Sequence, residues 1–152
     1  MRVVARLYLP SVEEMIESCG LDERGKVQKY IDNFVLEQSE PYMPKKTNTL
    51  IESGAKSTDI GSGQVIWDTP YAQYIHEGKL MVDPITLKGA FFSPDYGYWS
   101  RPKTEKILDP SGRNLDYHSG DDNRRDHWFD RMIVDKKEEL IEGCQRIVDG
   151  GN

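Results

Sequence analysis

The chain has few cysteines and no long apolar run. Its 152 residues include two cysteines, Cys19 and Cys144, which excludes the disulfide framework of a small secreted domain. No stretch approaches the about 20 apolar residues of a membrane span, and Arg6 interrupts the apolar N-terminal run, which argues against a secretory signal. We therefore expect a protein that folds in a reducing cytoplasm, has no membrane partner, and buries both cysteines as small hydrophobic residues.

Catalytic motifs are missing as well. No serine lies in a Gly-x-Ser-x-Gly elbow, and the segment Gly61-Ser62-Gly63 is too short for a phosphate loop and lacks the lysine that follows one. His76 and Glu77 are neighbours on a predicted helix, so their side chains diverge by about 100° and do not form an acid–base pair without other groups. These absences predict that the chain is not an enzyme and binds no cofactor.

One cluster resembles metal-ligand material. Carboxylates and imidazoles gather between residues 116 and 127, and its members are Asp116, His118, Asp121, Asp122, Asp126 and His127. No His-x-x-x-His or Cys-x-x-Cys pair fixes a ligand set, and acidic residues near a helix start also stabilise the helix dipole by about 0.3 to 1 kcal/mol. We expect no metal here, and a small metal-dependent hydrolase or nuclease using this cluster is the alternative function.

The charge balance excludes further classes of function. The chain is 30% charged and 37% hydrophobic, with a formal net charge of -6 and a pI of about 5.1. Nucleic-acid-binding modules concentrate Lys and Arg, so this balance argues against one, and it also counts against a regulatory module acting on DNA. The length fits one domain over residues 1–152 with a modest core and much polar or subunit-facing surface.

Helix signals stand near both ends of the chain. Ser11 and Glu14 form a capping-box pattern that predicts a short helix to about Ser18. A second helix is expected from Asp22 to Gln38 and a third to about Val148, with Asn123 and Asp126 as its caps. Their apolar residues recur at helical spacing: Val27, Tyr30, Ile31, Phe34 and Val35 in the second helix, and Phe129, Met132, Ile133, Leu140, Cys144 and Ile147 in the third.

The middle of the chain predicts turns and strands. Prolines 41 and 44 indicate an ordered turn to Thr49, with Asn48 in the left-handed conformation and a helical turn starting near Thr49. Residues 58–60 and 64–67 flank a glycine loop and predict a hairpin. A short helix follows from Pro70 to Glu77, and Gly78 in the left-handed region ends it. Residues 79–82 and 89–92 are two further candidate strands.

The segment from Ser93 to Gly120 is rich in Pro and Gly and predicts a long loop. Loops of this length are uncommon in compact domains unless they are functional or disordered. Its aromatic residues either dock on a neighbouring subunit or cover the end of the chain's own sheet. The predicted fold class is α+β: a small antiparallel sheet of three to four strands packed against two longer helices, with a long irregular loop.

The order of these elements resembles a known family. Thr47-x-x-Leu50 precedes the predicted hairpin, Pro70-Tyr71-Ala72-x-Tyr74-x-x-Glu77-Gly78 follows it, and the run from Asp126 to Arg131 comes late in the chain. This pattern, over residues 27–148, resembles the minor capsid and tail-completion proteins of long-tailed bacteriophages. The family usually has Gly where this chain has Asn48, a residue that a left-handed turn tolerates.

The resemblance implies a structural protein of the phage neck, a ring subunit that joins the DNA-filled capsid to the tail. Its partners would be further copies of itself and other neck, portal-side or tail proteins, and DNA would pass nearby without specific binding. The implied location is the virion, after assembly in the host cytoplasm. Within this interpretation we expect subunit contacts from loop residues, namely Tyr42, Asn48, Tyr96, Tyr98, Trp99 and Tyr117. The family motif predicts scaffold roles for Thr47, Leu50, Trp67, Pro70, Tyr71, Tyr74, Glu77, Gly78, Trp128 and Phe129.

Overall fold

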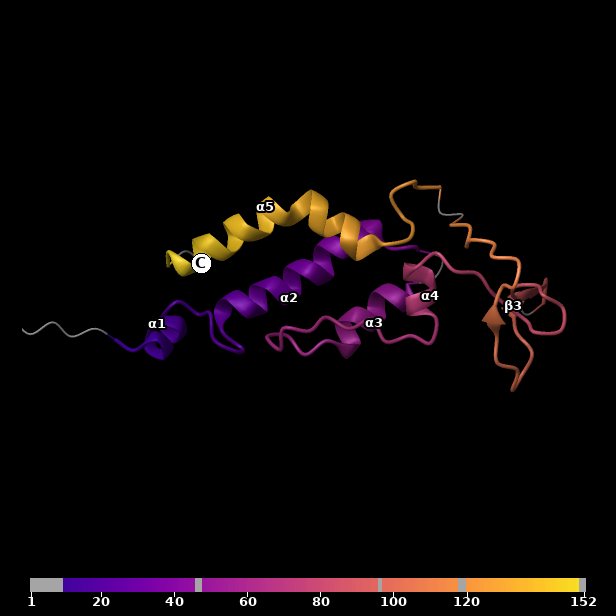
Figure 1. The fold of residues 1–152 in the computed structure, drawn as a ribbon, viewed down its shortest axis with the longest axis horizontal. Helices are drawn as coiled ribbons and strands as arrows, with labels where there is room; N and C mark the ends of the chain where they lie inside the picture. Colours follow the sequence, from indigo (N-terminus) through magenta and orange to yellow (C-terminus); the bar gives the residue numbers. More distant parts are fainter. Residues whose placement is uncertain (1–9, 46–47, 96, 118–119, 151–152) are drawn as a thin grey trace, which may run out of the picture.

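The computed structural model describes residues 10–45, 48–95, 97–117 and 120–150. Within these residues the chain is α+β and mostly helical, with little sheet (Figure 1). The helices are α1 (Val12–Ser18), α2 (Lys26–Ser39), the 3-10 helix η1 (Glu40–Tyr42), α3 (Thr49–Ser57), α4 (Ala72–His76) and α5 (Trp128–Val148). The strands are β1 (Met81–Val82), β2 (Phe91–Ser93), β3 (Gly97–Trp99) and β4 (Ile107–Leu108).

Helices α2 and α5 form the centre of the molecule and run side by side in opposite directions (Figure 1). The predicted apolar face of α2 is confirmed: Phe34 and Val35 are buried in the main core together with Met132 of α5. The two helices approach closely where Tyr30 faces Gly143, because a Cβ atom at that glycine would collide with the tyrosine ring. The helices therefore bury their apolar faces mainly against each other.

The α1 capping box is confirmed. Ser11 Oγ accepts a hydrogen bond from the Glu14 amide, and Glu14 Oε2 accepts one from the Ser11 amide. Helix α2 begins at Lys26, four residues later than predicted, because residues 22–25 form a turn in which the Gly25 amide donates to the Asp22 carbonyl. Asn48 precedes α3 with a φ of -69°, so its predicted left-handed conformation is wrong.

The hairpin expected over residues 58–67 is not formed. Helix α3 extends to Ser57, and the segment that follows forms no strand: it turns through local hydrogen bonds, such as that from the Ile66 amide to Thr58 Oγ1, and also bonds to the α2 region. Asp32 of α2 is buried and its Oδ2 accepts hydrogen bonds from the amides of Gly61 (2.7 Å) and Gly63 (3.2 Å). The Arg24 amide donates to the Gly61 carbonyl. A side chain and a backbone group of the α2 region therefore hold the glycine loop of the expected hairpin, while the segments on either side of it form no strands.

The predicted short helix before Gly78 is confirmed as α4, which begins two residues after Pro70. Gly78 has a φ of +70° and follows α4 as expected. Residues 79–115 then form a β-lobe at one end of the molecule (Figure 1), where β1 pairs with β4 and β2 pairs with β3, both antiparallel.

The expected single sheet of three to four strands under the helices is therefore wrong. The Ser93–Gly120 segment, expected to be irregular, contains β3 and β4.

Two buried carboxylates organise the turns of the β-lobe. Asp83 Oδ1 accepts from the amides of residues 85 and 86, and its Oδ2 lies 3.3 Å from Arg101 Nε. Asp109 accepts from Ser111 and from Arg113 Nε, and these contacts lower its pKa to about 2. Each acidic group is thus neutralised inside the lobe, which leaves the lysines of the lobe to determine its outer charge.

Helix α5 differs from its predicted burial. Trp128 and Met132 are buried, but Phe129, expected to face inward, is 37% exposed and lines an open apolar cavity beside α2. Cys144 and Cys19 are free and half-buried, so their predicted full burial is also wrong. None of the helices in the described part of the chain combines the length and apolar composition that a bilayer crossing needs.

Replacing Asp32 by Ala tests the hydrogen bonds between α2 and residues 61–65, which we call the glycine segment. The change leaves the amides of Gly61 and Gly63 without their acceptor, and we expect the free energy of unfolding to fall by about 2 to 4 kcal/mol. Urea unfolding of the full chain measures this loss. The matched control is Asn33→Ala, on the exposed neighbouring position of the same helix. Equal stability of the two variants would contradict the assigned role of Asp32.

Candidate functional site

Two arginines join distant parts of the chain at the end of α2. Arg124 Nη1 donates hydrogen bonds to the carbonyls of Glu40 (2.8 Å) and Met43 (2.9 Å). Asn123 Nδ2 donates to the Pro41 carbonyl, and the Arg125 amide donates to the Tyr42 carbonyl. Residues 123–125 thus add donors to the carbonyls around η1, one of which, that of Glu40, also accepts the Met43 amide. This junction brings the Pro41 turn, which precedes the first family motif, beside the chain that leads into the Asp126–Arg131 run.

Arg131 closes the same junction from α5. Its guanidinium donates to the carbonyls of Asn123, Arg125 and Asp126 at 2.9 to 3.2 Å, and at 3.3 Å to that of Tyr42. Its Cζ atom also lies 5.5 Å from the centre of the Tyr42 ring. Because a guanidinium presents five donors in one plane, a single side chain serves all these acceptors.

Tyr42 is part of the core rather than an accessible anchor for a neighbouring subunit. Only 8% of its surface is exposed, and its hydroxyl donates to Asp135 Oδ2 of α5 at 2.8 Å. Burial and this carboxylate raise the pKa of Tyr42. Arg131 and α5 thus cover the ring in the single chain, and its expected role as a subunit contact stays a prediction.

Tyr117 also makes its contacts within the chain. Its hydroxyl donates a short hydrogen bond to the Ile75 carbonyl of α4, and burial, with Asp126 nearby, raises its pKa to about 12. The Leu115 amide donates to the Gly78 carbonyl close by. Tyr117 thus fastens the segment that leaves the β-lobe to α4, the helix that precedes the lobe. Its side chain is half-buried by these contacts within the chain.

A pair of histidines lies where α4 meets α5. The His127 amide donates to the His76 carbonyl at 2.7 Å, and the two rings lie 5.2 Å apart between centres. The His76 ring packs edge-on against Trp128 at 4.6 Å, and its Nε2 lies 3.6 Å from Asp130 Oδ2. Burial lowers the pKa of His76, and Asp130 opposes that shift. The neutral ring therefore fits this site best.

The acidic and histidine cluster at residues 116–127 does not assemble a ligand set among the described residues. No group of three or more His, Cys, Asp or Glu side chains there lies close enough to hold a metal ion. His127 Nδ1 faces Asp126 Oδ2 at 3.3 Å, while Asp121 lies beside Arg124 at 3.6 Å. His118 lies outside the described residues. His127 itself begins α5 with a φ of +48°, so the predicted caps Asn123 and Asp126 are wrong.

The predicted scaffold residues fall into three groups. Leu50, Gly78 and Trp128 are buried, and Trp67 packs edge-on against Trp128 with ring centres 6.2 Å apart. Tyr74 is half-buried. The exposed residues are Pro70, Tyr71, Glu77 and Phe129, and Thr47 lies outside the described residues. The motif thus combines core residues with surface residues around α4.

The other predicted contact residues are less fully placed. Asn48 is exposed in the turn before α3. The backbone of Tyr98 and Trp99 forms part of β3 in the β-lobe. Tyr96 lies outside the described residues. The structure therefore leaves Asn48 on the surface, removes Tyr42 from it, and puts β3 in a lobe that projects from the helices.

Several cavities open on the described surface, and two of them lie beside the segments discussed above. One, of about 420 Å³, is lined by Tyr117, Gly120, Asp121, Asp122, Arg124 and Arg125. The other, of about 300 Å³, is mainly apolar and lies between α2 and the glycine segment, lined by Gln28, Ile31, Asp32, Val35, Gly63, Val65, Trp67 and Phe129. Neither brings together an acid, a base and a nucleophile in a catalytic arrangement.

Sequence reasoning missed two exposed apolar surfaces of the described chain. In α1 no residue is buried, and Val12 and Met15 are 61% and 45% exposed. In the β-lobe, Ile85 is 71% exposed and Leu108 is 53% exposed. The helical spacing of Val12, Met15 and Ile16 was a usable signal for the first surface. The sequence offered no comparable signal for the apolar surface of the β-lobe, because residues 79–92 were expected to form strands and residues 93–120 a loop.

We compared the chain with protein families, with curated proteins and with solved structures, and none of these comparisons found a match. The family resemblance therefore remains an expectation from the motifs quoted above.

Replacing Arg131 by Lys tests the junction at the end of α2. A lysine ammonium is a point charge and does not reach all the carbonyls that the planar guanidinium serves. We expect a loss of about 1 to 3 kcal/mol in the free energy of unfolding, measured with urea. Arg146→Lys, on an exposed site near the end of the same helix, is the control and should unfold like the wild type. Unchanged stability of the Arg131 variant would refute this account of the junction.

The lowered pKa of His76 predicts a pH dependence of stability. Because burial holds the folded-state pKa below the unfolded value of about 6.5, the unfolded chain binds the proton more readily. Stability is therefore greatest above about pH 6.5 and falls as the pH drops below it. Urea unfolding of the wild type at pH 8 and pH 5 should show this loss, and His76→Gln should reduce it. The same pH dependence in both proteins would count against His76 as its source.

Proposed function

We propose that the chain is a structural subunit of the neck of a long-tailed bacteriophage, part of a ring that joins the DNA-filled capsid to the tail. The motifs from Thr47 to Gly78 and from Asp126 to Arg131 suggest the family. Its partners are further copies of itself and neighbouring neck, portal-side or tail proteins, and its place is the virion after assembly in the host cytoplasm.

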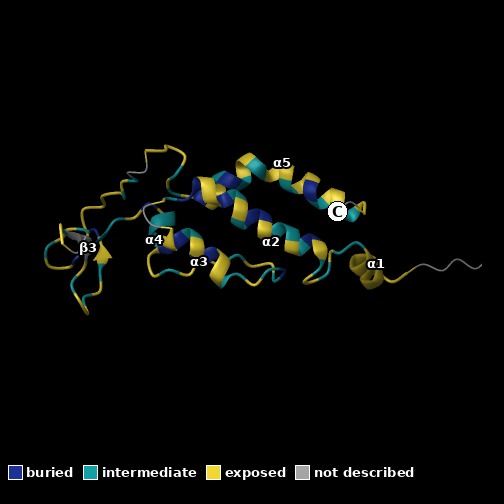
Figure 2. Ribbon diagram, turned by 180° about the vertical axis from the view of Figure 1, so that it is seen from behind, coloured by how far each residue is buried: buried dark blue, intermediate teal, exposed yellow. Residues whose placement is uncertain are grey.

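One observation carries the proposal: α1 is a complete, capped helix that buries none of its residues among the described residues. A seven-residue helix is not stable in water by itself, and its apolar side chains favour a partner. Figure 2 shows α1 exposed throughout, at the tip of the molecule. A subunit of an assembly has this partner in its neighbours, whereas a chain that acts alone does not.

The arginine junction is compatible with the same role. Arg124 and Arg131 hold residues 40–43, which precede the first motif, against the chain that leads into and through the second motif, so the helical body offers a fixed scaffold from which other surfaces are presented. The net charge of -6 suits a channel for DNA, because a surface of like charge gains nothing from counterion release and lets DNA slide. The proposal assigns no catalytic step to any residue.

Cryo-electron microscopy of the purified full chain at high concentration tests the ring. We expect closed rings whose inner surface is net acidic. A channel lined by Lys and Arg would overturn the proposed passage of DNA without binding.

A phage that encodes this chain tests the role itself. Without the protein, DNA-filled heads and complete tails should accumulate separately, because the joint between them is missing. Electron microscopy of lysates measures the ratio of free to joined heads. Normal numbers of joined particles without the protein would refute the proposal.

A further inference from the structure

Helix α1 is held in a fixed direction away from the helical body. The Leu21 amide donates to the Ile16 carbonyl and the Gly20 amide to the Glu17 carbonyl, both at 3.0 Å, a pattern that closes the helix end. The Val27 amide of α2 then donates to the Gly20 carbonyl at 3.0 Å. This continuous set of hydrogen bonds connects α1 to α2, so α1 does not fold back over its own body.

The exposed surface of α1 has an apolar part and an acidic part. Its apolar side chains are Val12, Met15 and Ile16, all exposed. Acidic residues surround them: Glu13, Glu14 and Glu17 in the helix, followed by Asp22 and Glu23, with Arg24 as the basic residue of this stretch. A surface of this kind fits an apolar partner surface that carries positive charge.

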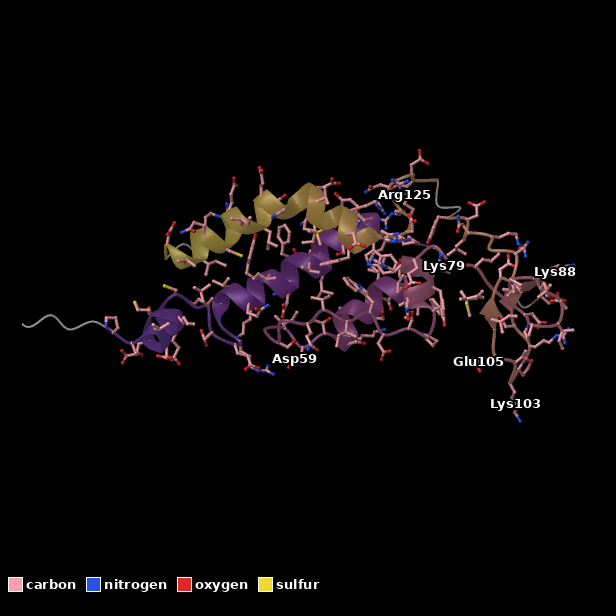
Figure 3. All side chains as sticks on the ribbon, in the orientation of Figure 1. Asp59, Lys79, Lys88, Lys103, Glu105 and Arg125 are labelled. Carbon is pink, nitrogen blue, oxygen red and sulfur yellow. The ribbon has the colours of Figure 1, made fainter. Side chains whose placement is uncertain are left out.

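The β-lobe offers such a surface. Its exposed apolar side chains are Ile85, Leu87, Ile107 and Leu108. Its basic residues are Lys79, Lys88, Arg101, Lys103, Lys106 and Arg113, against Asp83, Asp95, Glu105 and Asp109. Asp83 and Asp109 are buried and paired with Arg101 and Arg113, whose own side chains stay largely exposed, so Asp95 and Glu105 are the acidic groups that remain on its outside. Figure 3 shows Lys88 at the outer end of the lobe and Lys103 at its lower tip.

We infer that α1 of one copy packs on the β-lobe of the next copy, with apolar side chains in contact and glutamates facing lysines. The two surfaces lie at opposite ends of the molecule (Figure 1). A contact between opposite ends is head-to-tail, and repeated head-to-tail contacts give a ring when the rotation closes. The inference rests on the proposed function, since it names the surfaces through which the ring subunits would meet.

The apolar cavity between α2 and the glycine segment is a poorer partner for α1. No Lys or Arg is among its lining residues, and Asp32 is one of them. The glutamates of α1 would therefore meet no positive charge there, whereas the lobe supplies several lysines.

A pair of charge reversals tests the contact. The first variant is Glu13→Lys with Glu17→Lys, which leaves the Ser11–Glu14 capping box intact. The second is Lys88→Glu with Lys103→Glu, both on exposed side chains of the lobe. Self-association of each full-length protein is measured by analytical ultracentrifugation, and circular dichroism checks that helix content is unchanged. The control is Glu138→Lys with Glu142→Lys, on exposed positions of α5.

Each variant alone should associate at least about tenfold more weakly than the wild type, because like charges then face each other across every contact. An equal mixture should recover wild-type association, since every contact between the two variants pairs opposite charges. The α5 control should associate normally, and association of the wild type should weaken as salt rises.

Any one of three results would overturn the inference. The two variants could each associate as strongly as the wild type, the mixture could fail to recover association, or the wild type could stay monomeric at the highest concentration reached. A failure of this kind is distinct from failure of the neck role. If rings form through other surfaces, the α1–lobe inference fails but the phage experiment can still support the neck role. If joined particles form without the protein, the neck role fails, whichever surfaces the subunits use to associate.

Discussion

The structure depends on the way that backbone carbonyls at the end of α2 obtain donors. The chain leaves α2 through η1, and Arg124 and Arg131 donate to the carbonyls of residues 40, 42 and 43 from far along the sequence. These exposed and half-buried hydrogen bonds hold the start of α5 beside η1. Once α5 starts there, its apolar side chains must face α2, and Tyr42 is enclosed between them.

The sequence predicts local structure where one residue type decides the outcome. The α1 capping box, the apolar face of α2 and the glycine that ends α4 are all confirmed, because each depends on residues within one or two turns. Residues 58–67 were predicted wrongly for the opposite reason. Their pattern suits a hairpin, but Asp32 of α2 binds the glycine amides of the loop, and the Thr58 side chain, not a strand carbonyl, accepts the Ile66 amide.

The candidate surfaces show the same division. The late Asp126–Arg131 run could be singled out from the sequence, but the role of its arginine depends on carbonyls near residue 42, a pairing that spacing does not reveal. Tyr42 was assigned to the surface because it stands in a proline-rich turn, and only the three-dimensional contact with α5 shows its burial. The outer charge of the β-lobe could not be predicted either, because the sequence does not show that Asp83 and Asp109 are buried and paired with arginines.

Two stretches of chain connect the β-lobe to the helices, one entering after Gly78 and one leaving near Leu115. They form a narrow stalk, secured by the Leu115–Gly78 hydrogen bond and by Tyr117. The angle between lobe and body is therefore determined by few bonds, while each part keeps its own internal packing. In any assembly that uses both ends of the molecule, this stalk would set the curvature, and small changes at Gly78 or Tyr117 would alter how many copies complete a circle.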